Sequence, residues 1–79
     1  MIGGITMAEF NAGYEIIKTE RVGNKEFVLG HNPSAPDPYV TWKRNVGTTD
    51  YYWGNYFTDE ARALKNFKQR VQDEKNYER

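Results

Sequence analysis

Three prolines within six residues, at positions 33, 36 and 38, divide this chain of 79 residues into two parts. Proline fixes its own φ and lacks the N–H group that a helix interior or a sheet ladder requires. We therefore predict a stiff, extended surface loop over residues 32–38, with regular structure only before and after it. A chain of this length has room for one small hydrophobic core, and hence for one domain.

The segment before the prolines alternates apolar and polar residues with period two, which is typical of a half-buried strand. This pattern predicts one strand over residues 14–21 and a second over 26–30. Residues 22–25, Val-Gly-Asn-Lys, supply a turn, because Gly and Asn adopt positive φ at low cost. Residues 14–30 are therefore expected to form a β-hairpin.

The segment after the prolines predicts a second hairpin. Residues 39–44 and 51–57 are rich in aromatic and β-branched side chains, which favour strands, and residues 45–50 form the turn between them. Gly54 lies inside the last strand. A glycine there indicates a β-bulge, or a place where another side chain packs flat on the backbone.

A helix follows the second hairpin. Thr58 is the expected N-cap, and acidic residues occupy the first turn, where the helix dipole favours them. Leu64, Phe67 and Val71, with Ala63 beside them, form a single apolar stripe at helical spacing. The helix is expected to fray near its end, over residues 75–79.

These segments predict an α+β fold. A four-stranded antiparallel sheet, made of two hairpins, carries one C-terminal α-helix packed on one face. The domain covers residues 13–79 in the order ββββα. Residues 1–12 contain paired glycines and no clean periodicity, so they are expected to form a flexible N-terminal arm.

Composition excludes several functional classes. Eleven basic and eleven acidic residues give a formal net charge of zero, which argues against non-specific nucleic-acid binding and against a polyanionic DNA mimic. The chain has no cysteine, so disulfides and thiolate metal sites are excluded and a reducing, cytoplasmic location is expected. No run approaches the roughly 18 consecutive apolar residues of a membrane span, and no secretion signal is evident.

The chain lacks the side chains of a catalytic centre. His31 is its only histidine and Ser34, inside the proline loop, is its only serine, so neither a metal-binding histidine pair nor a nucleophile–base pair is expected. The ordinary role of His31 would be a hydrogen bond to the backbone. We expect a protein that is not an enzyme and that holds no metal and no cofactor.

Aromatic side chains are unusually frequent, at 15% of the chain. Strict alternation places Tyr51, Trp53 and Phe57 on one side of the last strand and Tyr52 and Tyr56 on the other. A single helix can cover only one of these faces. The uncovered set either pairs across strands on a solvated face or forms a patch that binds a partner.

Two aromatic motifs carry a resemblance to a known domain. The runs 27–33, 35–42 and 52–57, followed by a basic helix, resemble a short domain in accessory proteins encoded by conjugative and related mobile elements of Gram-positive bacteria. The similarity covers about residues 14–72. It implies an origin in a mobile element, where small proteins are commonly anti-defence factors such as anti-CRISPR or anti-restriction proteins that cover a working surface of a nuclease.

Our leading hypothesis is therefore a small protein-binding module that blocks a defence nuclease sterically. The expected contact residues are Trp42, Tyr52, Trp53 and Tyr56, with Lys43 and Arg44 at the rim. One of the two tryptophans is expected to lie in the core beneath the helix.

Three alternatives remain open. A single-stranded nucleic-acid-binding module would stack bases on the same aromatic residues. Its phosphate contacts would be Lys43, Arg44, Arg62 and Lys65. A homodimerisation module would bury the aromatic face against a second copy, and an open sheet edge beside the proline loop would accept a strand from a partner.

Overall fold

The alternating residues before the prolines form the predicted hairpin in a computed structural model, which describes residues 8–77. Strand β2 spans Tyr14–Val22 and strand β3 spans Lys25–His31, and the two pair antiparallel. The turn between them contains Gly23 at a φ of 61°, a conformation that glycine adopts without a steric penalty. The prediction of a hairpin over residues 14–30 is confirmed.

The second hairpin is also present. Strand β4 spans Tyr39–Asn45 and pairs antiparallel with β5, which spans Tyr52–Phe57. The pairing register shifts between Thr41 and Lys43 of β4, so β5 has one residue more than its neighbour at this place. The extra residue produces the β-bulge that Gly54 led us to expect.

The sheet has five strands, so the prediction of four is wrong in number. The additional strand, β1, spans Phe10–Asn11 and pairs with the start of β2, giving the strand order β1-β2-β3-β4-β5. It lies within the segment that was expected to be a flexible arm, residues 1–12. The chain reverses at Ala12 and Gly13, which both have positive φ. Residues 1–7 of that predicted arm lie outside the described residues.

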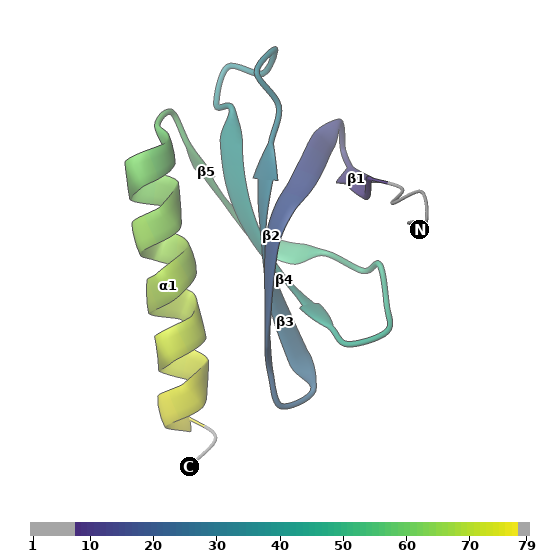
Figure 1. Ribbon diagram of the computed structural model, residues 1–79, viewed down its shortest axis with the longest axis vertical. Coiled ribbons are helices and arrows are strands. Elements are labelled where there is room, and N and C mark those ends of the chain that lie inside the picture. Colours follow the sequence, from purple (N-terminus) through teal and green to yellow (C-terminus); the bar gives the residue numbers. More distant parts are fainter. Residues whose placement is uncertain (1–7, 78–79) are drawn as a thin grey trace, which may run out of the picture.

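Helix α1 spans Glu60–Tyr77 and runs beside the sheet (Figure 1). Its N-cap is Asp59, not Thr58 as predicted, because Asp59 Oδ1 accepts a hydrogen bond from the Arg62 N–H at 2.8 Å. A carboxylate at this position also interacts favourably with the positive end of the helix dipole. The predicted apolar stripe is confirmed.

A first hydrophobic core lies between α1 and the sheet, whose strands β2 to β5 all contact the helix. Each large side chain that is fully buried here stabilises the fold by about 1.5–3 kcal/mol. The buried residues are Val22, Phe27 and Leu29 from the sheet and Ala63, Phe67 and Val71 from the helix.

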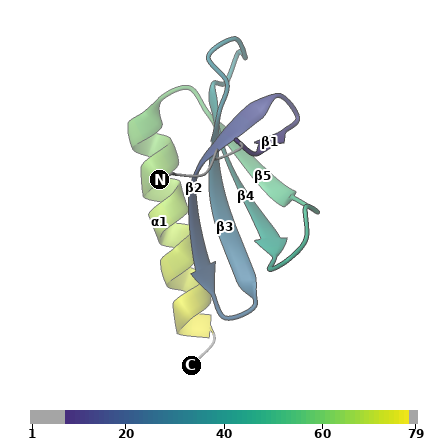
Figure 2. The same ribbon diagram turned by 45° about the vertical axis from the view of Figure 1, so that its right-hand side comes forward.

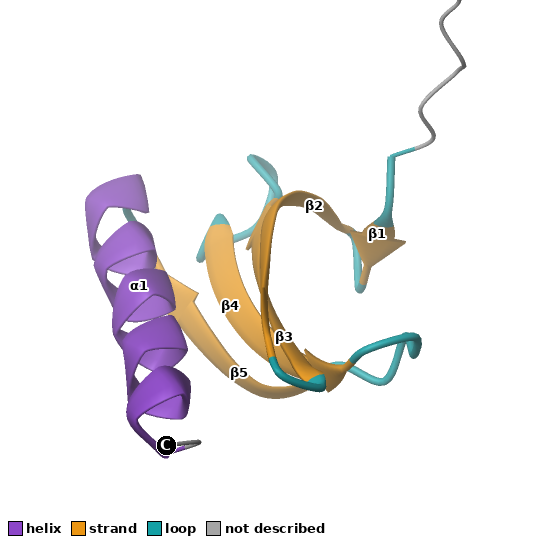
Figure 3. Ribbon diagram, turned by 60° about the horizontal axis from the view of Figure 1, so that its bottom comes forward, coloured by secondary structure: helices purple, strands orange, loops and turns teal. Residues whose placement is uncertain are grey.

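A second core occupies the opposite face of the sheet. Figure 3 shows the strands curving around this face, which points away from α1. Its buried residues are Tyr14, Val28, Val40 and Trp42. The expectation that one aromatic set lacks cover therefore needs correction, because the curvature of the sheet lets part of that set bury itself.

The proline loop helps to close the second core. The Asn32 N–H donates to the Pro38 carbonyl at 2.8 Å, so the loop folds back on itself and is less extended than predicted. The Tyr14 hydroxyl donates to the Asp37 carbonyl at 2.7 Å, and Ala35 packs against the second core. The loop is thereby fixed to β2.

Candidate functional site

Trp42 belongs to the second core and is only 5% exposed. Its ring makes an edge contact with Tyr14 at a centroid distance of 5.7 Å and a tilted contact with Tyr51 at 5.4 Å. A side chain with so little exposed area cannot anchor a partner. Two expectations are thus corrected: Trp42 is not a surface contact, and it lies in the core on the face away from α1, not beneath the helix.

The bulge in β5 changes the faces that strict alternation predicted. Tyr51 and Tyr56 both lie near Trp42, with Tyr56 at a centroid distance of 6.3 Å, on the face away from the helix. Trp53 lies on the helix side, where its ring centroid is 5.1 Å from Lys43 Nζ. The ring of Tyr52 makes an edge contact with the ring of Trp53 at a centroid distance of 5.4 Å. One extra residue in the strand accounts for the change, because every position beyond it moves to the other face.

Lys43 is held within the fold. Its Nζ lies 3.2 Å from the Glu74 carboxylate of α1, and it also stands over the rings of Phe27 and Trp53. The ammonium is therefore neutralised by a carboxylate and packed between two aromatic rings.

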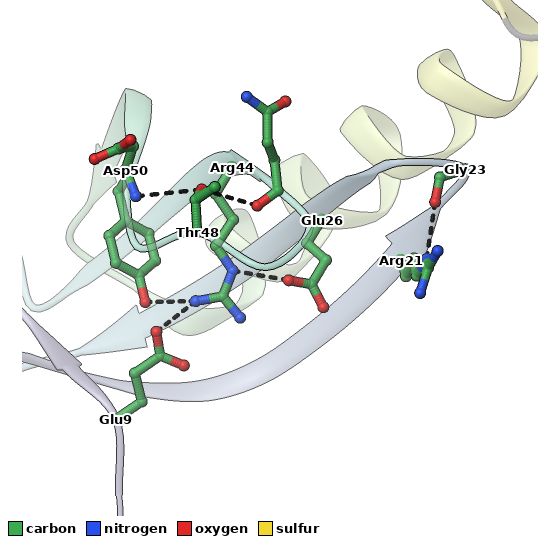
Figure 4. A network of polar contacts seen from close by, with 9 residues as sticks. Glu9, Arg21, Gly23, Glu26, Arg44, Thr48 and Asp50 are labelled. Atoms are coloured by element: carbon green, nitrogen blue, oxygen red, sulfur yellow. Dashed lines mark hydrogen bonds and ion pairs between the residues drawn. The ribbon is translucent and has the colours of Figure 1, made fainter.

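Arg44, on the opposite face of β4, is the centre of an ion-pair network (Figure 4). Its guanidinium donates to Glu26 Oε1 at 2.9 Å, to a Glu9 carboxylate oxygen and to the Tyr51 hydroxyl. Burial lowers the pKa of Arg44, but its hydrogen bonds to Glu9 and Glu26, together with the negative charges of these carboxylates, outweigh that effect and leave the pKa raised. This arginine therefore fastens β3 and the residue before β1 to β4, and its charge is compensated by two carboxylates.

Trp53 is the residue that most needs an explanation. It is 70% exposed and has a φ of 57°, although the left-handed region costs a residue with a Cβ roughly 1–2 kcal/mol. Tyr56, two places further along β5 from Gly54, is also half exposed, at 50%. Strain and exposed aromatic area thus coincide on one strand.

A hollow, which we call the Trp53 hollow, opens between Trp53 and the last turns of α1. Arg70 crosses it and donates from Nη1 to the backbone and side-chain oxygens of Thr41, at 3.2 and 3.1 Å. Burial lowers the pKa of Arg70, and the nearby Tyr52 opposes that shift. The residues that line the Trp53 hollow are Phe27, Lys43, Trp53, Arg70, Asp73, Glu74 and Tyr77.

A second hollow, the Phe57 hollow, lies between the end of β5 and the first turns of α1. Asn66 fastens the helix to β4 and β5, because its Oδ1 accepts hydrogen bonds from Thr41 Oγ1 at 2.7 Å and from Asn55 Nδ2 at 3.2 Å. The lining residues are Phe57, Arg62, Lys65, Asn66 and Gln69. Each hollow is lined by one residue of β5, Trp53 in the first and Phe57 in the second.

The four cations of the nucleic-acid alternative are not brought together. Lys43 and Arg44 point to opposite faces of β4, and each is paired with carboxylates. Arg62 and Lys65 lie on α1 and line the Phe57 hollow. Among residues 8–77, these four cations therefore form no continuous track past the exposed aromatic side chains.

Strand β5 forms one edge of the sheet, as the side-by-side strands β2 to β5 in Figure 2 show. It pairs with β4 on one side and, among the described residues, with no strand on the other. We call the exposed run Trp53–Tyr56 on this strand the β5 edge. Together with the two hollows it forms a surface that contains the exposed rings of Trp53, Tyr56 and Tyr77.

Sequence reasoning missed Tyr77, because the end of the helix was expected to fray. Tyr77 is still helical, is 85% exposed and lines the Trp53 hollow. Its only signal in the sequence is its position, ten residues after Phe67 on a predicted helix. His31, the other singled-out residue, stacks on Tyr39 at a ring-centroid distance of 4.6 Å.

Within residues 8–77, no cluster of three or more His, Cys, Asp or Glu side chains is arranged to hold a metal ion. Over the same range, no helix is both long enough and apolar enough to cross a membrane.

Comparisons with other proteins add no family to these observations. No family model matches the chain, and neither a curated protein nor a solved structure matches it. The resemblance to a mobile-element domain thus stays a prediction from the sequence motifs, and function is argued from the β5 edge.

Proposed function

We propose that this protein is a non-catalytic protein-binding module whose contact surface is the β5 edge. The observation that carries the proposal is the state of Trp53, which is exposed and held in a strained backbone conformation. The fold gains little from this arrangement, since Trp53 belongs to neither core. A partner that covers the Trp53 ring would remove this apolar area from water, and its burial would stabilise the complex.

The surroundings of Trp53 support a protein partner. Interface cores are enriched in Trp and Tyr and carry few uncompensated charges. Lys43 and Glu74 beside Trp53 neutralise each other, and Tyr77 adds a second exposed ring. A nucleic acid would instead need free cations next to the stacking rings, and the two nearest basic residues of β4, Lys43 and Arg44, are already paired.

The finer proposal is that the partner is a nuclease of a host defence system and that the module inhibits it by steric block. This step rests on the resemblance of the aromatic motifs to the mobile-element domain. The shape of the chain fits such a role, because a body of 37 × 35 × 21 Å can occlude a cleft without chemistry of its own.

Affinity capture tests both levels of the proposal. The full chain is immobilised and exposed to lysate of cells carrying CRISPR and restriction systems, with and without nuclease treatment. Trp53→Ala is compared with Phe10→Ala, a matched control that removes a 61% exposed ring from the opposite edge of the sheet. We expect the same nuclease subunit in both lysates, lost with Trp53→Ala and retained with Phe10→Ala.

Other outcomes would contradict the proposal at different levels. Recovery only from untreated lysate would indicate binding through nucleic acid. A partner that is no nuclease, but is still lost with Trp53→Ala, would keep the protein-binding module and remove the anti-defence role. Capture that is insensitive to Trp53→Ala would remove the β5 edge from the interface.

A further inference from the structure

We infer that the partner of this protein supplies an extended, acidic segment that pairs with β5 as a sixth strand. The inference rests on the proposed function, since it names the chemistry of the segment that the β5 edge would bind. It is carried by the open backbone of β5, by the absence of charge on that strand and by the charges of the adjacent hollows.

The first step concerns how sheet edges are protected. An open edge offers unpaired N–H and C=O groups to any other strand, and proteins commonly guard it with charged side chains or proline. The open part of β2, beyond β1, carries Lys18, Glu20 and Arg21. Strand β5, Tyr-Trp-Gly-Asn-Tyr-Phe, has neither a charged residue nor a proline. The bulge at its start is its one protection, so the stretch Asn55–Phe57 is free to accept a strand.

The second step concerns the place that an added strand would occupy. The bond between Asn55 and Asn66 holds α1 close beside β5. The neighbouring helix positions Arg62, Lys65 and Gln69 line the Phe57 hollow, which meets β5 at its last residue, Phe57. Alternate side chains of a sixth strand would therefore point toward α1 and enter this hollow.

The third step concerns charge. The Phe57 hollow is lined by two cations, and by no carboxylate. Arg62 has an exposed partner, Asp59, at 3.9 Å, which is a weak, solvent-screened pair. Lys65 has no carboxylate within 4.0 Å among residues 8–77. An acidic side chain on the added strand would supply the missing counter-charge.

The Trp53 hollow has a different character. Its basic residues, Lys43 and Arg70, are balanced by Asp73 and Glu74, and its free surface is provided by Trp53 and Tyr77. It therefore suits an apolar or aromatic side chain. Since all pairings in this sheet are antiparallel, we place the acidic residues in the N-terminal half of the added strand, beside Phe57, and the apolar residue in its C-terminal half, beside Trp53.

A second copy of the chain fits this site less well. Pairing of β5 with β5 would place Tyr52 of one copy near Phe57 of the other, and β5 contains no carboxylate to meet Arg62 and Lys65. The occupant we commit to is therefore a segment of another protein.

Selection from a library of random peptides tests the inference. The immobilised full chain is used to select from displayed peptides of about ten residues, the length of a long strand. We expect enrichment of peptides without proline whose N-terminal half is acidic. The double variant Arg62→Glu with Lys65→Glu should enrich basic peptides instead and weaken the best acidic peptide at least about tenfold. Lys68→Glu, a helix lysine that lines neither hollow, is the matched control and should change neither result.

Backbone pairing is tested on the best peptide by N-methylation of one residue at a time. Pairing with a single edge uses every second peptide N–H, so methylation should abolish binding at alternate positions and be tolerated between them. Loss of binding with helical periodicity, or tolerance at every position, would overturn the inference. So would the absence of acidic enrichment, or an unchanged preference in the double variant.

The molar mass from light scattering tests whether a second copy of the chain occupies the β5 edge. A dimer that dissociates when Asn55→Pro interrupts the open edge would assign β5 to a second copy and overturn the inference. If the peptide tests fail while capture in the lysate still depends on Trp53, the β5 edge remains an interface and only the sixth strand is wrong. If both fail, the proposed function fails as well.

Discussion

Trp42 packs against Gly54 so closely that a Cβ on Gly54 would stand 2.7 Å from Trp42 Nε1. This contact joins the second core to the bulge of β5. Because the bulge also turns Trp53 to the helix side, the same local geometry buries one tryptophan and leaves the other exposed. The candidate interface is thus a consequence of how the second core is closed.

Gly54→Ala should destabilise the protein by about 1–3 kcal/mol, the range for an overpacked core. The added methyl group would have to displace the Trp42 ring, which the surrounding core holds in place. Gly47→Ala is the comparator, because it meets open space and loses stability only through its φ of 84°. Urea unfolding measures both variants, and a Gly54→Ala protein as stable as the wild type would show that Trp42 does not rest on this backbone.

The two tryptophans should respond differently to the same substitution. Trp42→Phe removes part of a buried ring and should cost about 1–2 kcal/mol, as other cavity-forming changes do. Trp53→Phe alters an exposed side chain and should stay within about 0.5 kcal/mol. Urea unfolding of both variants measures these two losses in the free energy of unfolding. Equal losses would contradict the assignment of one tryptophan to the core and the other to the surface.

The fold was largely predictable from local signals. Period-two alternation located the first hairpin, and the spacing of Phe67 and Val71 located the buried face of the helix. Strand β1 was not predictable, because two residues cannot show a period. The turn after it also places Ala12 at positive φ, where glycine or asparagine would be the usual signal.

Arg44→Met should cost about 2 kcal/mol, the scale of hydrogen bonds to charged groups. The substitution leaves Glu26, whose side chain is largely buried, without its cationic partner, and releases Glu9 beside β1. Arg62→Met, at an exposed ion pair, is the matched control and should remain within about 0.5 kcal/mol. If both variants lose the same stability in urea unfolding, the Arg44 network does not fasten the sheet.

Tyr14 should make the protein sensitive to alkali. Burial raises the pKa of its hydroxyl above the ordinary value of 10.0, with smaller contributions from Tyr56 and Asp37. The folded state therefore favours the neutral phenol. The contribution of Tyr14 to the free energy of unfolding is fully present below pH 10 and is lost as the pH rises from 10 through the raised pKa.

Tyr14→Phe separates this effect from other alkaline losses. The variant should lose about 1 kcal/mol at neutral pH with the hydrogen bond to Asp37, and the gap to the wild type should narrow above pH 10. Tyr77→Phe, at an exposed tyrosine, should follow the wild-type curve. A gap between Tyr14→Phe and the wild type that is constant from pH 7 to 11 would contradict the raised pKa.

The candidate site was less predictable than the fold. Composition indicated a surplus of aromatic residues. The face of the sheet on which each ring lies depends on the one-residue bulge before Asn55, because a bulge interrupts the alternation from which faces are predicted. The charge runs gave no indication that Lys43 and Arg44 are neutralised by Glu74, Glu26 and Glu9, because two of these partners are more than 30 residues away in sequence. Tertiary contacts decide which cations remain free.

The most direct test of the account is amide hydrogen exchange of the full chain, alone and in complex with the partner that it captures. We expect protection on binding to be concentrated in β5 and in the α1 turns that line the two hollows. Protection centred on β1 and the open part of β2, with β5 exchanging as in the free protein, would contradict the claim that the β5 edge is the binding surface.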